Sequence, residues 1–379
     1  MPRPFGVYVH FPWCTHRCPY CDFAVTTEPQ PGGRRYARAI LAELGLRAPA
    51  FDGLAARSLY VGGGTPSLWD PDEIAEVVRA IAERVGLPAD AEVTLEANPE
   101  SCDRTRLEAW RAAGVNRVSV GAQSFDPGVL AKLGRRHGPE AASRAIRDAA
   151  DVVGNTSVDL IYGARRSTVE IARADAERAV AAGAAHVSAY ALTLDPDVLA
   201  EEVPLARMRR QGRLPLPGEE ETRAQGEAIR RALRRAGLRR YEISNFARPG
   251  RESVHNRLYW DGESYLGLGA GAYGCLRGEG RSVRYGNLRD AGAYMDAALA
   301  GRLPTAEEDR VEAQADRNER LMLALRTREG APLDALSPRQ AREASEAVRR
   351  RLAVRRAGRL VLTSRGLDVH SAFSERLFE

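Results

Sequence analysis

The chain has 379 residues, 44% of them hydrophobic, and a formal net charge of +5. This length predicts about two globular domains, and no apolar run reaches the ~20 residues of a transmembrane helix. Arginines mix with glutamates and aspartates on predicted helices, which indicates a solvated surface and no nucleic-acid partner. The front of the sequence shows no charged-then-apolar leader, which predicts a cytoplasmic protein with at most peripheral membrane contact.

Strand-like and helix-like runs alternate over the first 240 residues. We expect strands at 6–11, 58–61, 92–97, 115–120, 157–161 and 186–192, and helices at 34–46, 71–85, 103–113, 128–133, 139–152, 168–182 and 218–236. This order predicts an α/β fold with a parallel sheet, either doubly wound or a full or partial barrel. Polar or glycine-rich residues follow six strand ends, which favours a closed or nearly closed ring, because such ends meet on one face of a barrel.

Cys14, Cys18 and Cys21 form a C-x3-C-x2-C pattern after the first predicted strand. Since a [4Fe–4S] cluster usually has four cysteine ligands, three would leave one iron open to a small molecule. The alternatives are zinc with His10 or His16 as fourth ligand, buried structural thiols, and a disulfide framework. There is no second C-x2-C for zinc, and a long chain with five cysteines does not suit a disulfide framework. The pattern favours an iron–sulfur site.

Further candidate ligands follow the later strands. The triple glycine at 62–64 allows a ligand to approach the backbone closely, although glycine-rich turns are common. Side chains suited to the polar parts of an amino-acid or nucleoside ligand are Glu96, Gln123, Asp159 and Arg135, the last of these suited to a carboxylate.

Taken together, these segments resemble the radical S-adenosylmethionine (SAM) superfamily and, within it, the family of the oxygen-independent coproporphyrinogen dehydrogenases (HemN) and the HemW heme chaperones. The matching stretches are 8–23, 60–68 (YVGGGTPSL), 95–100 (LEANPE), 114–125 (GVNRVSVGAQSF), 133–138, 158–163, 188–192 and 241–274. The resemblance implies a partial (β/α)6 TIM-like barrel, a cluster held by the three cysteines, and SAM on the open iron. It implies SAM contacts from Tyr8, Tyr20, Gly63, Gly64, Thr65, Glu96, Gln123, Arg135, Asp159 and Ala191.

Three features favour the chaperone branch. The dehydrogenases have a further cysteine two places after the third and a longer N-terminal segment, whereas Asp22 and Phe23 follow Cys21 here and 13 residues precede Cys14. The sequence HNRLYW matches an HNxxYW motif that the resemblance associates with heme, which implies heme contacts from His255, Asn256, Tyr259 and Trp260. The residues alone favour a hydrogen-bonded turn with aromatic core packing. Two departures from the family pattern, at 164–166 and Tyr273, concern the substrate or heme side.

The expected organisation is a radical SAM core at 1–240, a barrel-closing segment with the heme motif at 241–300, and a winged-helix-like α+β domain at 301–379. In that last domain we expect helices at 317–325 and 338–353, a strand pair within 358–363 and a final helix. The predicted function is a heme chaperone that delivers heme to respiratory proteins. The alternatives are an oxygen-independent coproporphyrinogen III oxidase that decarboxylates a porphyrinogen in porphyrin biosynthesis, and a zinc-stapled barrel.

Overall fold

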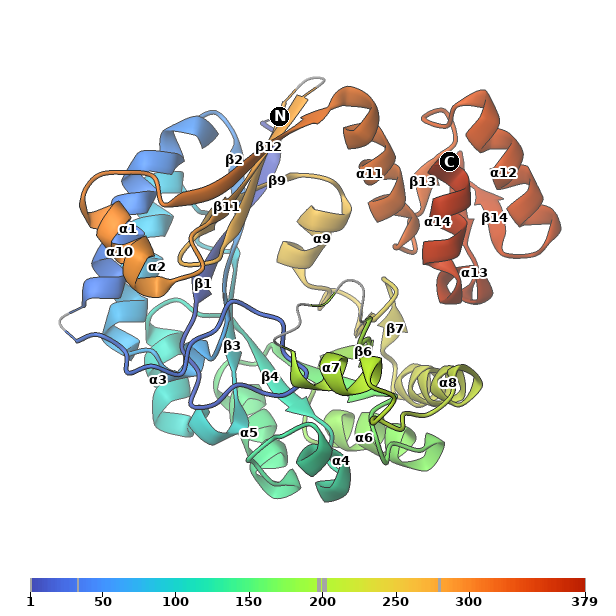
Figure 1. Cartoon of the computed structure of the whole chain (residues 1–379), viewed down its shortest axis with the longest axis horizontal. Coiled ribbons are helices and arrows are strands. Elements are labelled where there is room, and N and C mark those ends of the chain that lie inside the picture. Colours follow the sequence, from blue (N-terminus) through green and yellow to red (C-terminus); the bar gives the residue numbers. More distant parts are fainter. Residues whose placement is uncertain (1, 33, 196–198, 200–202, 279–280, 379) are drawn as a thin grey trace.

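The computed structural model describes residues 2–32, 34–195, 199, 203–278 and 281–378. Among them, twelve strands form one sheet in the order β12-β11-β10-β9-β1-β2-β3-β4-β5-β6-β8-β7. Its six central strands are parallel: β1 (Pro4–Phe11), β2 (Ala55–Gly63), β3 (Glu92–Ala97), β4 (Arg117–Gln123), β5 (Thr156–Tyr162) and β6 (His186–Ala191). The sheet curves but stays open in the described residues, because β1 pairs with β9 and β6 with β8 (Figure 1). The expected partial barrel is confirmed.

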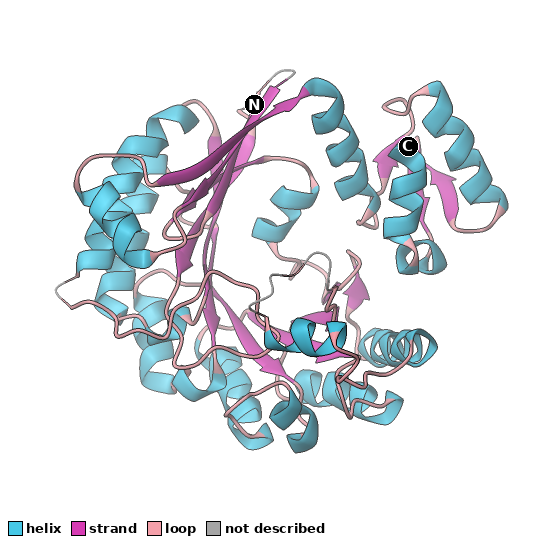
Figure 2. Cartoon of the chain, in the orientation of Figure 1, coloured by secondary structure: helices cyan, strands magenta, loops and turns pink. Residues whose placement is uncertain are grey.

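Helices cover the outer face of the curved sheet (Figure 2). They are α1 (Arg35–Arg47), α2 (Pro71–Val85), α3 (Arg104–Ala112), α4 (Pro127–Lys132), α5 (Pro139–Val152), α6 (Val169–Ala181) and α8 (Glu219–Arg235), with α7 (Pro204–Arg210) and the short 3-10 turns η1 (Ala48–Phe51), η2 (Pro66–Leu68) and η3 (Pro99–Ser101) between them. Capping residues determine where α2 begins and ends. Asp70 accepts hydrogen bonds from the first-turn amides, and Gly86 ends the helix in the left-handed conformation. Helix α7 was not expected from the sequence.

After α8 the chain extends the sheet at both sides. Strands β7 (Arg239–Arg240) and β8 (Asn245–Ala247) follow β6, while β9 (Ser264–Leu268), β10 (Tyr273–Arg277), β11 (Arg281–Asn287) and β12 (Thr305–Glu312) continue beyond β1. Helix α10 (Ala291–Leu299) packs on α1. Helix α9 (Val254–Trp260) lies on the concave side of the sheet and contacts β1, β2 and β9 (Figure 1). This helix therefore packs against the inside of the partial barrel.

The last part of the chain has an apolar core of its own, which includes Leu325, Leu360 and Leu377. Its elements are α11 (Ala313–Leu325), β13 (Ala331–Pro332), α12 (Pro338–Arg349), β14 (Ala353–Arg356), β15 (Arg359–Leu362), α13 (Ser364–Asp368) and α14 (His370–Phe378), with the strands in the order β13-β15-β14. The helix expected at 338–353 ends earlier, because Arg351 adopts a positive φ of 60° before β14 begins. No helix in the described ranges is long and apolar enough to cross a membrane.

Candidate functional site

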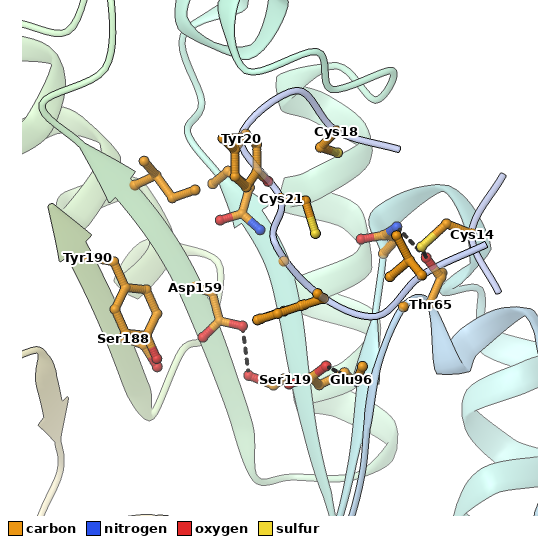
Figure 3. A pocket seen from close by; sticks show the side chains of 18 of the residues that line it. Cys14, Cys18, Tyr20, Cys21, Thr65, Glu96, Ser119, Asp159, Ser188 and Tyr190 are labelled. Carbon is orange, nitrogen blue, oxygen red and sulfur yellow. Dashed lines mark hydrogen bonds between the residues drawn. The ribbon is translucent and has the colours of Figure 1, made fainter. Parts of the chain in front are cut away.

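The three cysteines lie on one loop that is shaped by backbone hydrogen bonds. The amide of Cys14 donates to the carbonyl of Thr26 at 3.0 Å, the Thr26 amide donates to Pro12 at 2.8 Å, and the Cys21 amide donates to Cys18 at 3.1 Å. All three thiols line a cavity of about 410 Å³. Figure 3 shows them on one side of this cavity, facing Asp159 and Tyr190 on the strands opposite.

The thiols are partly or fully buried, and burial raises the pKa of two of them, Cys14 and Cys21. Burial raises the pKa of the Cys14 thiol to about 11, partly offset by a hydrogen bond from the Thr65 hydroxyl at 3.3 Å. The guanidinium Nη1 of Arg135 lies 3.6 Å from the Cys18 sulfur. Because metals bind thiolates, loading this loop must release protons, and the two donors stabilise the resulting negative charge.

The neighbouring histidines hydrogen-bond to backbone carbonyls, although Nε2 of His16 also lies 3.7 Å from the Cys18 sulfur. His10 contacts the hydroxyl of Tyr8 at 2.9 Å and donates to the carbonyl of Ala24 at 2.8 Å, and His16 donates to the carbonyl of Gly134 at 2.9 Å. Within the part of the chain that the structure describes, no three His, Cys, Asp or Glu side chains converge as ligands of one metal ion. This donor set fits a multi-iron cluster, in which each thiolate binds a different iron.

The turn after β2 brings backbone next to the cysteine loop. Gly63 has a φ of 112°, and a Cβ there would lie 2.6 Å from the ring of His10. A Cβ on Gly64 would lie 2.8 Å from the carbonyl oxygen of Trp13. The Gly64 amide donates to the carbonyl of Phe11 at 2.7 Å. Only glycine fits at these two positions, so the close approach of the two loops requires the second and third residues of the triple glycine.

Two carboxylates face the cavity from β3 and β5, the strands on either side of β4. Glu96 accepts hydrogen bonds from the hydroxyl of Tyr60 at 2.6 Å and from the Gly63 amide at 3.0 Å. Asp159 accepts a hydrogen bond from Ser119 at 3.1 Å (Figure 3). Burial raises the pKa of Glu96 to about 7 and also raises that of Asp159. The pair thus offers acceptors to the ammonium and hydroxyl groups of a ligand.

The raised pKa of Glu96 predicts a pH-dependent stability in the cofactor-free protein. The folded state binds this proton more tightly than the unfolded state, so its stabilising effect is present below the unfolded value of 4.5 and is lost as pH rises through about 7. Relative to wild type, the Glu96→Gln variant should therefore gain about 2 to 3 kcal/mol in unfolding free energy between pH 5 and pH 8. Urea titrations at the two pH values measure this difference, and a constant difference would contradict the assignment.

Buried guanidinium groups supply the opposite charge. Arg135 donates from Nη2 to the side-chain oxygen of Asn98 at 2.6 Å and to the carbonyl of Gly121 at 3.0 Å, whereas its Nε has no partner. Arg117 also lines the cavity, and its Nε lies 3.8 Å from the Glu92 carboxylate without a hydrogen-bond partner. Gln123 ends β4 with a positive φ of 64°, next to a register shift. Unpaired buried donors at a cavity indicate that a ligand completes their hydrogen bonds.

The structure places nine of the ten expected SAM contacts on this cavity: Tyr20, Gly63, Gly64, Thr65, Glu96, Gln123, Arg135, Asp159 and Ala191. Tyr8 is not among the lining residues, and its ring packs at 6.2 Å from that of Tyr60, which does line the cavity. The contacts to SAM themselves stay predictions.

Sequence reasoning missed Arg117, Ser119 and Ser188, which also line the cavity. The first two belong to an alternating set on β4 that continues through Gly121 to Gln123. Because alternate residues of a strand face the same side, counting back in steps of two from Gln123 would have found both.

The expected heme motif lies on α9 and is largely enclosed. His255 is 2% exposed, its Nδ1 contacts the Ser58 hydroxyl at 2.9 Å, and its Nε2 contacts the Tyr259 hydroxyl at 3.1 Å. Trp260 packs against Tyr241. Burial lowers the pKa of His255 to about 3, which keeps the ring neutral. Both ring nitrogens are therefore engaged, and heme ligation by His255 would require the ring to leave both partners.

The other two motif members differ in their surroundings. Asn256 lines the cavity itself. The ring of Tyr259 meets that of Tyr265 edge-on at 4.7 Å. The His255 ring stacks at 5.0 Å on Tyr60, which separates it from the cavity that Tyr60 lines. Heme contact by these four residues stays a prediction.

Comparison with known proteins agrees with this geometry. Residues 8–179 match the radical SAM superfamily. The heme chaperone HemW of Mycobacterium tuberculosis is 38% identical over 368 residues, which cover 96% of this chain and 92% of that protein. HemW of Escherichia coli is 33% identical over 332 residues, 87% of this chain and 84% of that protein. The chain belongs to the HemW family of the radical SAM superfamily.

Among solved structures, the fold is similar to that of coproporphyrinogen III oxidase (HemN) from Escherichia coli. The TM-score is 0.80 at 20% identity, over 99% of this chain and 90% of that one. An identity this low shows a shared fold alone. Membership of the superfamily implies a [4Fe–4S] cluster and SAM, and the cavity's three thiols, two carboxylates and buried guanidinium groups fit both.

Proposed function

We propose that this protein is a cytoplasmic heme chaperone that holds a [4Fe–4S] cluster and SAM at the ends of its parallel strands and hands heme to respiratory client proteins. One observation carries the proposal. Three thiols, a glycine turn, two carboxylates and an incompletely paired guanidinium surround one cavity, in a chain whose HemW relatives match it over most of its length.

The cavity residues divide into distinct tasks. Cys14, Cys18 and Cys21 would hold the cluster, and the bound pair of cofactors supplies a reducing electron beside a sulfonium group. Arg135 has a guanidinium nitrogen left for the SAM carboxylate, since its Nε lacks a partner. Glu96 offers its carboxylate to the SAM ammonium group.

Two observations favour a chaperone over an oxidase. Asp22 and Phe23 stand where the dehydrogenases carry a further cysteine, and both are exposed. Two relatives that are 38% and 33% identical to this chain are named as heme chaperones. The likeness to HemN concerns the fold, so a coproporphyrinogen III oxidase remains the second candidate.

A turnover assay separates the two candidates. The protein is reconstituted without oxygen, then given SAM, a chemical reductant and coproporphyrinogen III. We expect decarboxylation to stay at the level of a matched Cys18→Ala sample. In a separate titration of the same reconstituted protein, we expect hemin to bind. Product formation over many turnovers would instead establish the oxidase. A colourless sample, without an EPR signal after reduction, would contradict both and support the zinc-stapled barrel.

A further inference from the structure

An aromatic rim lies beside the cysteine loop and outside the set of SAM contacts. Phe23 is 60% exposed and lines the cavity, and Tyr273, the first residue of β10, is 52% exposed. Among large apolar side chains in the described ranges, the only other exposed aromatic one is Tyr190, which also lines the cavity. Exposed aromatic surface beside a cavity indicates a bound partner with an apolar face.

Contacts between the two segments show that the stretches carrying Phe23 and Tyr273 lie side by side. A Cβ on Gly271, two residues before Tyr273, would lie 2.4 Å from the Cβ of Ala24, which follows Phe23. Arg289 donates a hydrogen bond of 3.3 Å to the carbonyl of the residue before Phe23. The hydrogen bond to Glu307 raises the pKa of the Tyr273 phenol, and the positive charge of Arg289 nearby partly offsets this rise. The rim thus combines two exposed rings with a nearby positive charge.

The Tyr273 ring is held in place by the strand behind it. A Cβ on Gly286 would lie 2.8 Å from Cε1 of this ring, so the absence of a side chain on β11 makes room for it. The phenol donates a hydrogen bond to Glu307 on β12 at 2.6 Å. A fixed ring with free surface loses little entropy on binding, which makes it a suitable stacking platform.

The size of the cavity explains why a large ligand belongs at this rim. A volume of about 410 Å³ suits one drug-sized molecule, and nine of the expected SAM contacts line it. With SAM bound there, a tetrapyrrole would have to lie outside the cavity. His255 is enclosed behind Tyr60. On the basis of the proposed function, we propose that the tetrapyrrole lies across the cavity mouth, packed on Phe23 and Tyr273, with one of its carboxylates bound by Arg289.

The test uses the full-length, reconstituted protein with SAM, titrated with hemin and with metal-free coproporphyrin. Phe23→Ala and Tyr273→Ala should each weaken binding of both ligands about tenfold, whereas Tyr273→Phe keeps the stacking face and should bind like wild type. Arg289→Gln should weaken binding of both ligands about tenfold, but not that of a porphyrin with esterified carboxylates. Val354→Ala and Arg310→Gln, two exposed sites elsewhere, are the controls.

The outcomes separate this site from the function on which it rests. If wild type binds hemin and the Phe23, Tyr273 and Arg289 variants bind it equally well, the rim is overturned while the chaperone stands. Loss of hemin binding in His255→Ala alone would move the site to α9. If wild type binds neither hemin nor coproporphyrin, the rim and the chaperone proposal both fall.

Discussion

Cys18→Ala is expected to abolish assembly of the [4Fe–4S] cluster, whereas Cys102→Ala leaves it intact. Cys18 lines the cavity with Cys14 and Cys21, and no other cysteine of the chain lines it. A cluster already held by three thiolates has no ligand to spare. Cys102 is a matched control because its exposed fraction is 6% against 9% for Cys18. Iron and sulfide content, visible absorption and the EPR signal of the reduced sample measure the effect.

The same pair of variants tests the link between the cluster and SAM. SAM affinity should fall sharply in Cys18→Ala, because the open iron that completes the SAM site is absent. It should be unchanged in Cys102→Ala. A Cys18→Ala protein with its full iron content would show that a residue other than Cys18 supplies the third ligand, and the site as proposed would be wrong.

The parallel strands and their covering helices could be predicted because each carries a local signal. Strand β1 is apolar apart from His10 near its end, and α2 begins at Asp70 with Pro71 and ends at Gly86. Strands β9 to β12 lack such signals. In β12, Thr305–Glu312, six of the eight residues are exposed, so no buried face marks it as a strand. Its place depends on pairing with β11, a tertiary contact that local sequence does not encode.

The candidate site was predictable where polar residues lie in or just after the parallel strands. Cys14, Glu96 and Asp159 lie far apart in sequence, and the barrel topology alone brings them to one cavity. Arg117 was missed because it begins its strand and reads as the edge of a surface loop. Its neighbour Glu92 was missed for the same reason. Charged residues at the starts of parallel strands are easily interpreted as exposed to solvent. Here Glu92 is buried instead and hydrogen-bonds to the first residues of α9.

Glu92 holds the start of α9 in place, and replacing it should lower the free energy of unfolding considerably. The carboxylate accepts hydrogen bonds from the His255 amide at 2.9 Å and the Val254 amide at 3.0 Å, and from the Ser253 hydroxyl at 3.3 Å. It also lies 3.8 Å from Nε of Arg117, and both side chains are almost fully buried. Glu92→Ala would leave a buried guanidinium without its counter-charge, which typically costs about 3 to 5 kcal/mol.

Urea unfolding of the metal-free protein measures this loss, with Glu83→Ala as control. Glu83 is exposed on α2, so its variant should stay within about 0.5 kcal/mol of wild type. If Glu92→Ala loses no more than the control, α9 is held by its apolar contacts instead. The milder Glu92→Gln variant, which keeps one acceptor oxygen, then distinguishes the two heme sites. Loosening α9 should raise hemin affinity if His255 must leave Ser58 and Tyr259 to ligate iron, and should leave it unchanged if the Phe23–Tyr273 rim holds the tetrapyrrole.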